Sequence, residues 1–145
     1  MQLSTILLMA VAAIPSLATP ASASSLSMMA SDAPQWTIKS FLRTCNAPDT
    51  SCAYSFSIDT RSGTATPCIY TVTGNLASRA AYNSVLCGAF VVSSTWSGQF
   101  GPNEGFQTLA VVQGKTLIYP AYSDRQLVNG QVVSPDQSYA PQSLP

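Results

Sequence analysis

The stretch YSFSI at residues 54–58 shows most directly how this chain folds. Tyr54, Phe56 and Ile58 alternate with Ser55 and Ser57, and this period of two is that of a β-strand with one buried face. Aromatic and β-branched residues also favour strands. We therefore expect a strand here whose aromatic face packs into a core while its serine face meets solvent.

Similar runs occur on both sides of this stretch, separated by turn signals, and they predict strands at residues 36–43, 68–73, 90–95, 106–112 and 116–119. In the first run, simple alternation places Trp36 and Ile38 on one face, and Phe41 and Arg43 on the other. Asn129-Gly130 stands between two apolar pairs, which predicts a tight hairpin because both residues tolerate positive φ.

Two segments do not follow the strand pattern. Residues 76–86 have helical spacing, and a short helix and a long loop are both compatible with it. Residues 135–145 carry three prolines and are expected to run irregularly over the surface. Many short strands between turns predict an all-β fold, a single small antiparallel β-sandwich or barrel.

The first residues are expected to be an export signal. Residues 6–14, ILLMAVAAI, form an apolar run that ends at Pro15 and is followed by small residues. Such a run has the length of a signal-peptide core and is too short for a bilayer, which takes about 20 residues. We expect a signal peptide at 1–18 (alternatively 1–23), a flexible tail at 19–34 and a single β domain at 35–145. The mature protein is then secreted and extracellular, without membrane insertion.

The four cysteines are Cys45, Cys52, Cys68 and Cys87. In an exported chain an even number of cysteines favours disulfides over a metal site. We expect the pairs Cys45–Cys52, joined across a turn containing Ala-Pro-Asp, and Cys68–Cys87, each at the start of a strand-like run. Crossed and nested pairings remain open alternatives.

Charge and composition exclude several functions. Only 8% of the residues are charged, against about 25% in typical globular proteins, and the net charge is zero. A surface of this kind does not neutralise a phosphate backbone, so no nucleic-acid partner is expected. Histidine is absent, which excludes Ser-His-Asp catalysis and His-ligated zinc. No spacing brings two carboxylates together for glycoside hydrolysis. We expect no catalytic residue, metal or cofactor, and no enzyme activity.

Residues 96–106, WSGQFGPNEGF, are the most unusual segment, because aromatic side chains flank a glycine-rich loop. Such a loop can bind sugars or protein; a long connection whose Trp96 and Phe106 pack in the core is the other interpretation. A second cluster lies at residues 119–125. The two segments together give a candidate recognition surface of Trp96, Phe100, Glu104, Tyr122 and Arg125.

Several motifs resemble those of fungal small secreted proteins. They are the Trp-x-Ile-x-x-Phe opening at 36–41, YSFSID at 54–59, Cys87-Gly88, WSGQFGPNEGFQTLAVV at 96–112, and YPAYSDRQLVNGQVVSPDQSY at 119–139. They are similar to hypersensitive-response-inducing (Hrip-type) elicitors of plant-pathogenic ascomycetes, and more weakly to the Alternaria major-allergen family. In the allergen comparison Cys68–Cys87 matches the first bridge of the family, whose second, C-terminal bridge is missing here.

The resemblance implies a secreted β-fold that acts in the plant apoplast and is recognised by the host or suppresses its defence. We therefore expect a non-enzymatic effector or elicitor, a monomer or weak homodimer, that binds a plant host protein or a cell-wall component. The alternative is a carbohydrate-binding module or a small glycan-active hydrolase of the cell wall, in which Trp96, Phe100 and Tyr122 contact the sugar and Glu104 takes part.

Overall fold

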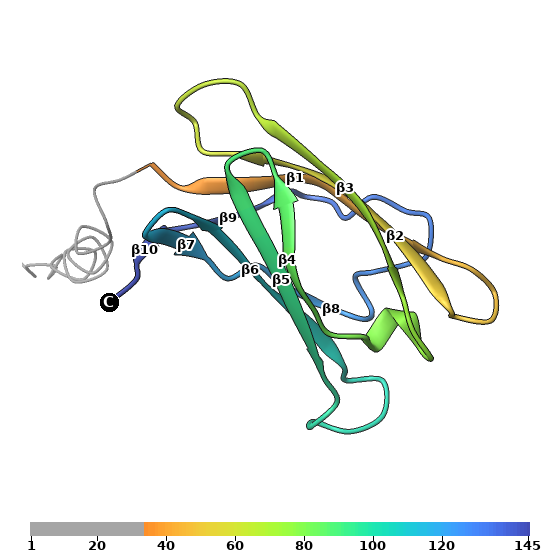
Figure 1. Ribbon diagram of the computed structural model, residues 1–145. Coiled ribbons are helices and arrows are strands. Elements are labelled where there is room, and N and C mark those ends of the chain that lie inside the picture. The colour runs from red at the N-terminus through yellow and green to blue at the C-terminus, as the bar shows by residue number, and fades with distance from the viewer. Residues whose placement is uncertain (1–33) are drawn as a thin grey trace, which may run out of the picture. The chain divides into compact units, whose positions relative to one another are not determined.

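The computed structural model describes residues 34–145, which form two antiparallel sheets (Figure 1). The first sheet has the order β3-β2-β1-β9, formed by β1 (Trp36–Cys45), β2 (Ser51–Asp59), β3 (Thr66–Thr73) and β9 (Gln137–Tyr139). The second has the order β10-β7-β6-β5-β4, formed by β4 (Tyr82–Cys87), β5 (Phe90–Ser97), β6 (Phe106–Gln113), β7 (Thr116–Ile118) and β10 (Gln142–Ser143). β8 (Ala121–Ser123) pairs with β6, and a 3₁₀ turn, η1 (Ala77–Arg79), precedes β4. The expected all-β antiparallel fold is confirmed. The expected signal peptide and nearly all of the expected tail lie outside the described residues.

The core lies between the two sheets and contains mostly the alternate residues of their strands. In β2, Tyr54, Phe56 and Ile58 are buried, as the alternation predicts. Aromatic rings join the sheets: Trp36 meets Phe90 edge-on at a centroid distance of 5.6 Å. Such a pair adds about 0.5–1.5 kcal/mol beyond the burial of its area. The sheets are therefore held together by apolar packing at the positions that the period-two pattern marks.

β1 departs from simple alternation at a bulge. Its pairing with β2 changes register between Lys39 and Leu42, and Ser40 has φ 54°. The extra residue turns the following side chains over, so Phe41 and Arg43 face the core on the same side as Ile38. The prediction that Phe41 and Arg43 lie opposite Ile38 is therefore wrong, because no bulge was anticipated.

The segment with helical spacing contains only the single turn η1, and then becomes the edge strand β4. Neither a helix nor a long loop over 76–86 is present. The disulfide between Cys68 of β3 and Cys87 of β4 joins the adjacent edges of the two sheets. This covalent link and the pairing of β4 with β5 account for an extended conformation that the local pattern did not favour.

The hairpin predicted at Asn129-Gly130 is wrong. A turn is present, but the residues on either side do not pair as strands. The Asn129 side chain instead accepts a hydrogen bond from the Cys45 amide (2.6 Å) and donates one to the Cys45 carbonyl (3.1 Å). The asparagine thus binds the end of β1 rather than serving a hairpin of its own.

The C-terminal segment is not irregular throughout, contrary to expectation. β9 pairs with the start of β1, and β10 pairs with β7, so the segment adds one strand to each sheet. The Ser40 amide donates to Asp136 Oδ1 at 2.8 Å, which fixes the bulge of β1 from this same segment. The end of the chain therefore belongs to the sandwich.

Both expected disulfides, Cys45–Cys52 and Cys68–Cys87, are present. In the chain-entropy model they stabilise the fold by about 2.5 and 3 kcal/mol, because each removes loop freedom from the unfolded chain. The first closes the hairpin between β1 and β2 at the paired residues Cys45 and Cys52.

Candidate functional site

The loop of residues 98–105 connects β5 to β6 and carries the exposed aromatic residue of the candidate surface. Phe100 is 67% exposed and stacks on Phe106 at a centroid distance of 5.7 Å. Two tight turns shape the loop: the Gly101 amide donates to the Gly98 carbonyl (3.1 Å), and the Glu104 amide donates to the Gly101 carbonyl (3.2 Å). The loop therefore has internal structure and holds Phe100 outward.

Arg125, just after β8, fastens this loop to the second sheet. Its Nη2 donates to Glu104 Oε1 at 2.7 Å, and its Nε donates to the Asn103 carbonyl at 3.2 Å. Both partners of the ion pair are more than half exposed, so the pair contributes at most about 1 kcal/mol. Its main effect is positional: the loop and Arg125 present one surface.

Trp96, at the end of β5, lies half-buried under this loop. Its Nε1 donates to Asp124 Oδ2 at 2.9 Å, and the Arg79 guanidinium lies 4.6 Å from the centroid of its ring, within cation–π range. Gly98 and Gly105 pack so closely on the indole that a Cβ there would come within 2.5 Å of Trp96 Cη2 and 2.6 Å of Cζ2, respectively. Only glycine fits at these two contacts without movement of the tryptophan.

A pocket of about 440 Å³ opens between this loop and Arg79. We call it the loop pocket; its lining residues are Arg79, Trp96, Gly98, Gly101, Pro102, Asn103, Gly105 and Asp124. Ligand pockets in proteins are typically about 300–1,000 Å³. A smaller pocket of about 220 Å³, over β5 and β6, is lined mainly by small side chains and contains no charged residue. The loop pocket is therefore the better candidate for binding.

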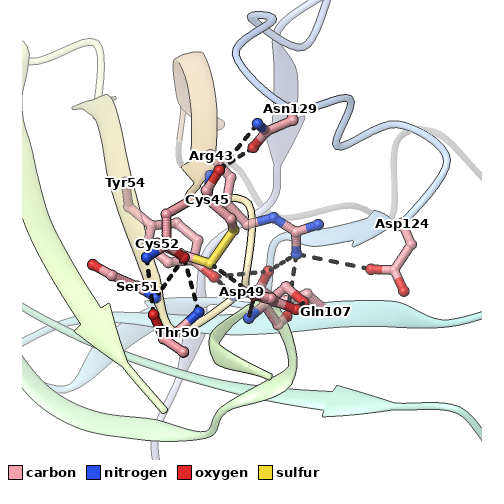
Figure 2. Close-up of a disulfide and its surroundings, with 12 residues drawn as sticks. Arg43, Cys45, Asp49, Thr50, Ser51, Cys52, Tyr54, Gln107, Asp124 and Asn129 are labelled. Carbon is pink, nitrogen blue, oxygen red and sulfur yellow. Dashed lines mark hydrogen bonds and ion pairs between the residues drawn. A yellow bond between two sulfur atoms is a disulfide. The ribbon is translucent and has the colours of Figure 1, made fainter. Parts of the chain in front are cut away.

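A buried arginine, Arg43, pairs with Asp124, one of the residues that line the loop pocket (Figure 2). Arg43 is only 8% exposed; its Nη1 donates to the Ser78 carbonyl (3.2 Å) and to Gln107 Oε1 (3.3 Å), and lies 3.8 Å from Asp124 Oδ1. Asp124 Oδ1 is buried and makes no hydrogen bond within residues 34–145. Asp124 is thus held between the Trp96 indole and the Arg43 guanidinium, and it connects the loop pocket to the core.

The buried network continues through Gln107, whose Nε2 donates to Tyr54 Oη (3.0 Å) and Ser94 Oγ (2.9 Å). The hydroxyls of Tyr70 and Tyr82 are 2.6 Å apart. Burial raises the pKa of Tyr54, Tyr70 and Tyr82 above the usual 10, because the charged phenolate is poorly solvated there. The tyrosines are therefore neutral hydrogen-bonding groups that support the site from below.

The hairpin loop closed by Cys45–Cys52 supports the Arg79 side of the loop pocket. Asp49, within that loop, accepts hydrogen bonds from the Ser78 amide (2.8 Å) and the Ser78 hydroxyl (2.5 Å). The sulfur atoms of Cys45 and Cys52 and a carboxylate oxygen of Asp49 lie within 4.8 Å of one another, a spacing that metal ligands can have. Both sulfurs are bonded in the disulfide, so this grouping positions η1 and is not a set of thiolate ligands.

The structure brings together four of the five residues of the expected recognition surface. Trp96, Phe100, Glu104 and Arg125 gather at the loop of residues 98–105. Tyr122 does not belong with them: it is 1% exposed and stacks on Phe41 at a centroid distance of 4.2 Å, so its assignment to a surface is wrong. It lies on the inward face of β8, a short strand that the sequence pattern did not predict.

Sequence reasoning did not assign Arg79, Asn103 or Asp124 to the recognition surface. Arg79 lies in the segment with helical spacing, and its approach to Trp96 depends on a contact between distant elements. A lone arginine between small residues carries no local signal of such a contact. Within residues 34–145, no helix is long and apolar enough to cross a membrane.

The comparisons with known proteins agree with this outline. A family model described as Effector TSP1 matches residues 37–144, a range that includes both disulfides and the loop pocket. The protein Effector TSP1 of Hypocrea virens (strain Gv29-8 / FGSC 10586) is 52% identical over 122 residues, which cover 82% of each chain. The likeness to Hrip-type elicitors and to the allergen family stays a resemblance in sequence, while the expected class, a fungal effector, is supported. The chain belongs to the Effector TSP1 family.

Proposed function

We propose that the protein is a secreted effector that acts in the plant apoplast by binding a host protein or a cell-wall component, without catalysing a reaction. The family supports the effector class. The two disulfides suit an oxidising extracellular compartment. The apolar run at residues 6–14 supports export.

The observation that carries the proposal is the surface formed by Trp96, Phe100, Glu104 and Arg125, which we call the loop surface. It combines an aromatic residue that is 67% exposed with an arginine whose side chain is 69% exposed, on a loop fixed by its own turns. Aromatic residues and arginine dominate the binding energy of protein interfaces. A pre-organised loop also loses little conformational entropy when it binds.

Binding is favoured over hydrolysis by the state of the carboxylates. Glu104 is paired with Arg125, and Asp124 with Arg43 and the Trp96 indole. An acid/base pair for glycoside hydrolysis needs two carboxyl groups that face the same bond. Here the carboxylates hold the loop and the floor of the loop pocket. The carbohydrate-binding alternative gains support from that pocket, and the hydrolase alternative does not.

The test uses the mature protein with its disulfides intact, incubated with isolated leaf cell walls and with apoplastic fluid. We expect saturable binding that Phe100→Ser and Arg125→Ala each weaken by at least about tenfold. Ile69→Ser is the matched control for Phe100, because Ile69 is 77% exposed on β3 of the other sheet. Lys115→Ala is the control for Arg125, because Lys115 follows the far end of β6.

The same variants infiltrated into leaves should lose the induction of defence markers in proportion to their loss of binding. Equal binding and equal induction by the wild type and by Phe100→Ser and Arg125→Ala would refute the assignment to the loop surface. No binding and no response to the wild-type protein in several hosts would refute the proposed function itself.

A further inference from the structure

We propose that the loop pocket binds a saccharide that carries a carboxylate, a uronic-acid residue, with Arg79 as the group that receives the carboxylate. This inference rests on the proposed function and names the chemistry of the component that is bound. The volume of the loop pocket, about 440 Å³, lies in the range of small-molecule sites. The loop pocket offers one cation, hydrogen-bonding side chains around it, and backbone amides of which some already donate within the protein.

Arg79 is an exposed cation whose position is fixed. Its guanidinium lies over the Trp96 ring, and the neighbouring Ser78 donates two hydrogen bonds to the Asp49 carboxylate. Within residues 34–145, no carboxylate oxygen lies within 4.0 Å of Arg79, whereas Arg43 and Arg125 each have an acidic partner. The pocket therefore presents one unmatched positive charge, and a guanidinium matches a carboxylate in a two-pronged geometry.

The single cation of the loop pocket and the amides already in use favour a carboxylate over a phosphate. Phosphate sites in loops are usually built from several free amide groups that point at the anion. Here the amides of Gly101 and Glu104 donate to carbonyls of the same loop, and the Asp124 amide donates to the Gly105 carbonyl. Arg79 is the one cation among the residues that line the loop pocket, and a singly charged carboxylate matches a single guanidinium.

The rest of the lining suits the hydroxyl groups of a sugar. Asn103 offers a side-chain amide that can both donate and accept, and Asp124 adds a carboxylate beside it. Pro102 and Trp96, both in the lining, give a small apolar contact for ring carbons. An acidic peptide would use larger apolar subsites or a free strand edge, and the lining of the loop pocket offers only this small apolar contact.

Trp96 does not act as a stacking platform in this arrangement. Arg79 lies over the indole, and Gly98 and Gly105 press against it, so the ring is the support on which the arginine lies. Specificity would then depend on charge more than on stacking. A neutral ester of the same saccharide should bind poorly.

The test is an NMR titration of the mature protein, observing the Trp96 indole N–H, with a trimer of galacturonic acid as probe. We expect a saturable shift. We also expect affinity to fall at least about tenfold for the fully methyl-esterified trimer and for Arg79→Gln, with a smaller loss for Arg79→Lys. Arg61→Gln is the matched control: Arg61 is exposed, lies outside the loop pocket and also has no carboxylate partner within 4.0 Å among residues 34–145.

Equal affinity for the trimer and its methyl ester, or for the wild type and Arg79→Gln, would overturn the inference. So would equal affinity for a blocked tri-glutamate peptide, because it would make the pocket a general anion site. A failure of the proposed function can be told apart from a failure of this inference. If the trimer does not bind but wall or host binding through Phe100 and Arg125 persists, only the inference is wrong; if the trimer binds but the leaf assays show no partner and no response, only the proposed function is wrong.

Discussion

Replacement of Gly105 by alanine tests whether the loop pocket is held by close packing on Trp96. Gly105 is buried and its backbone is not left-handed, so alanine introduces no backbone strain. Its Cβ would lie 2.5 Å from Asp124 Oδ2 and 2.6 Å from Trp96 Cζ2. Ordinary contacts between carbon atoms are about 3.5–4.0 Å, so the indole and the carboxylate must each move about 1 Å away from the added Cβ.

The expected loss in the free energy of unfolding is about 1.5–5.5 kcal/mol. Overpacking costs about 1–3 kcal/mol, and the weakened Trp96–Asp124 hydrogen bond, which involves a charged acceptor, adds about 1.5–3 kcal/mol. The lower entropy of an unfolded chain with alanine offsets about 0.4–1 kcal/mol. Urea denaturation measures the loss, and faster hydrogen exchange of the Trp96 indole N–H locates it.

Gly114→Ala is the control, because Gly114 has φ +61° with no atom within 4 Å of the added Cβ. This variant should lower the free energy of unfolding by about 1–2 kcal/mol, because alanine is strained in the left-handed conformation. Hydrogen exchange of the Trp96 indole N–H should stay unchanged. In a Trp96→Ala background the loss from Gly105→Ala should shrink, since much of the clash is gone, giving a coupling of at least about 0.5 kcal/mol. Additive losses, or a stable Gly105→Ala protein with an unchanged indole signal, would refute the packing argument.

Three further predictions concern the groups beneath the loop pocket. Gln107→Leu should lower the free energy of unfolding by at least about 2 kcal/mol, because the buried groups that bond to Gln107 lose their partner. The control, Gln113→Leu at an exposed position of the same strand, should change the free energy of unfolding by no more than about 0.5 kcal/mol. Equal urea denaturation curves for the two variants would contradict this prediction. Asp49→Ala should lower the free energy of unfolding by about 1–3 kcal/mol and speed hydrogen exchange of the Ser78 amide. Unchanged exchange would show that Asp49 does not hold η1. The raised pKa values of the buried tyrosines keep them protonated in the fold while the unfolded chain loses protons above pH 10. Stability should therefore be constant with respect to these groups below pH 10 and fall above it by up to about 1.4 kcal/mol per pH unit for each tyrosine; urea curves between pH 8 and 11 that do not change would contradict the burial of these phenols.

Local pattern was sufficient for much of the sandwich. The residues of β2 alternate so regularly that its buried face could be predicted residue by residue, because a half-buried strand requires this period. For β6 the pattern predicted a strand but not its buried face, which includes Gln107. The disulfide Cys45–Cys52 could be predicted because a turn former separates two cysteines that end adjacent strands. The unusual segment of residues 96–106 was found from composition alone, because glycines between aromatic residues stand out from the strand pattern.

The errors occur where contacts between distant segments override a local preference. The 76–86 segment has helical spacing, yet the disulfide to β3 and pairing with β5 make most of it an edge strand. Asn129-Gly130 has the dipeptide of a hairpin, yet the asparagine binds the backbone of Cys45, 84 positions away. Tyr122 was expected at the surface because the pairing of β8 with β6, which turns it inward, leaves almost no signal in three residues.

The sequence by itself determined an all-β, disulfide-linked domain with few charges and a glycine-rich loop, because periodicity, cysteine spacing and composition are properties of neighbouring residues. Only the tertiary structure decided where the few charges act. The bulge at Ser40, held by Asp136, turns Arg43 into the core beside Asp124, and the contact between Asp49 and Ser78 places Arg79 over Trp96. Each of these contacts joins residues at least 17 positions apart, so their geometry depends on how the two sheets pack and not on the local chain.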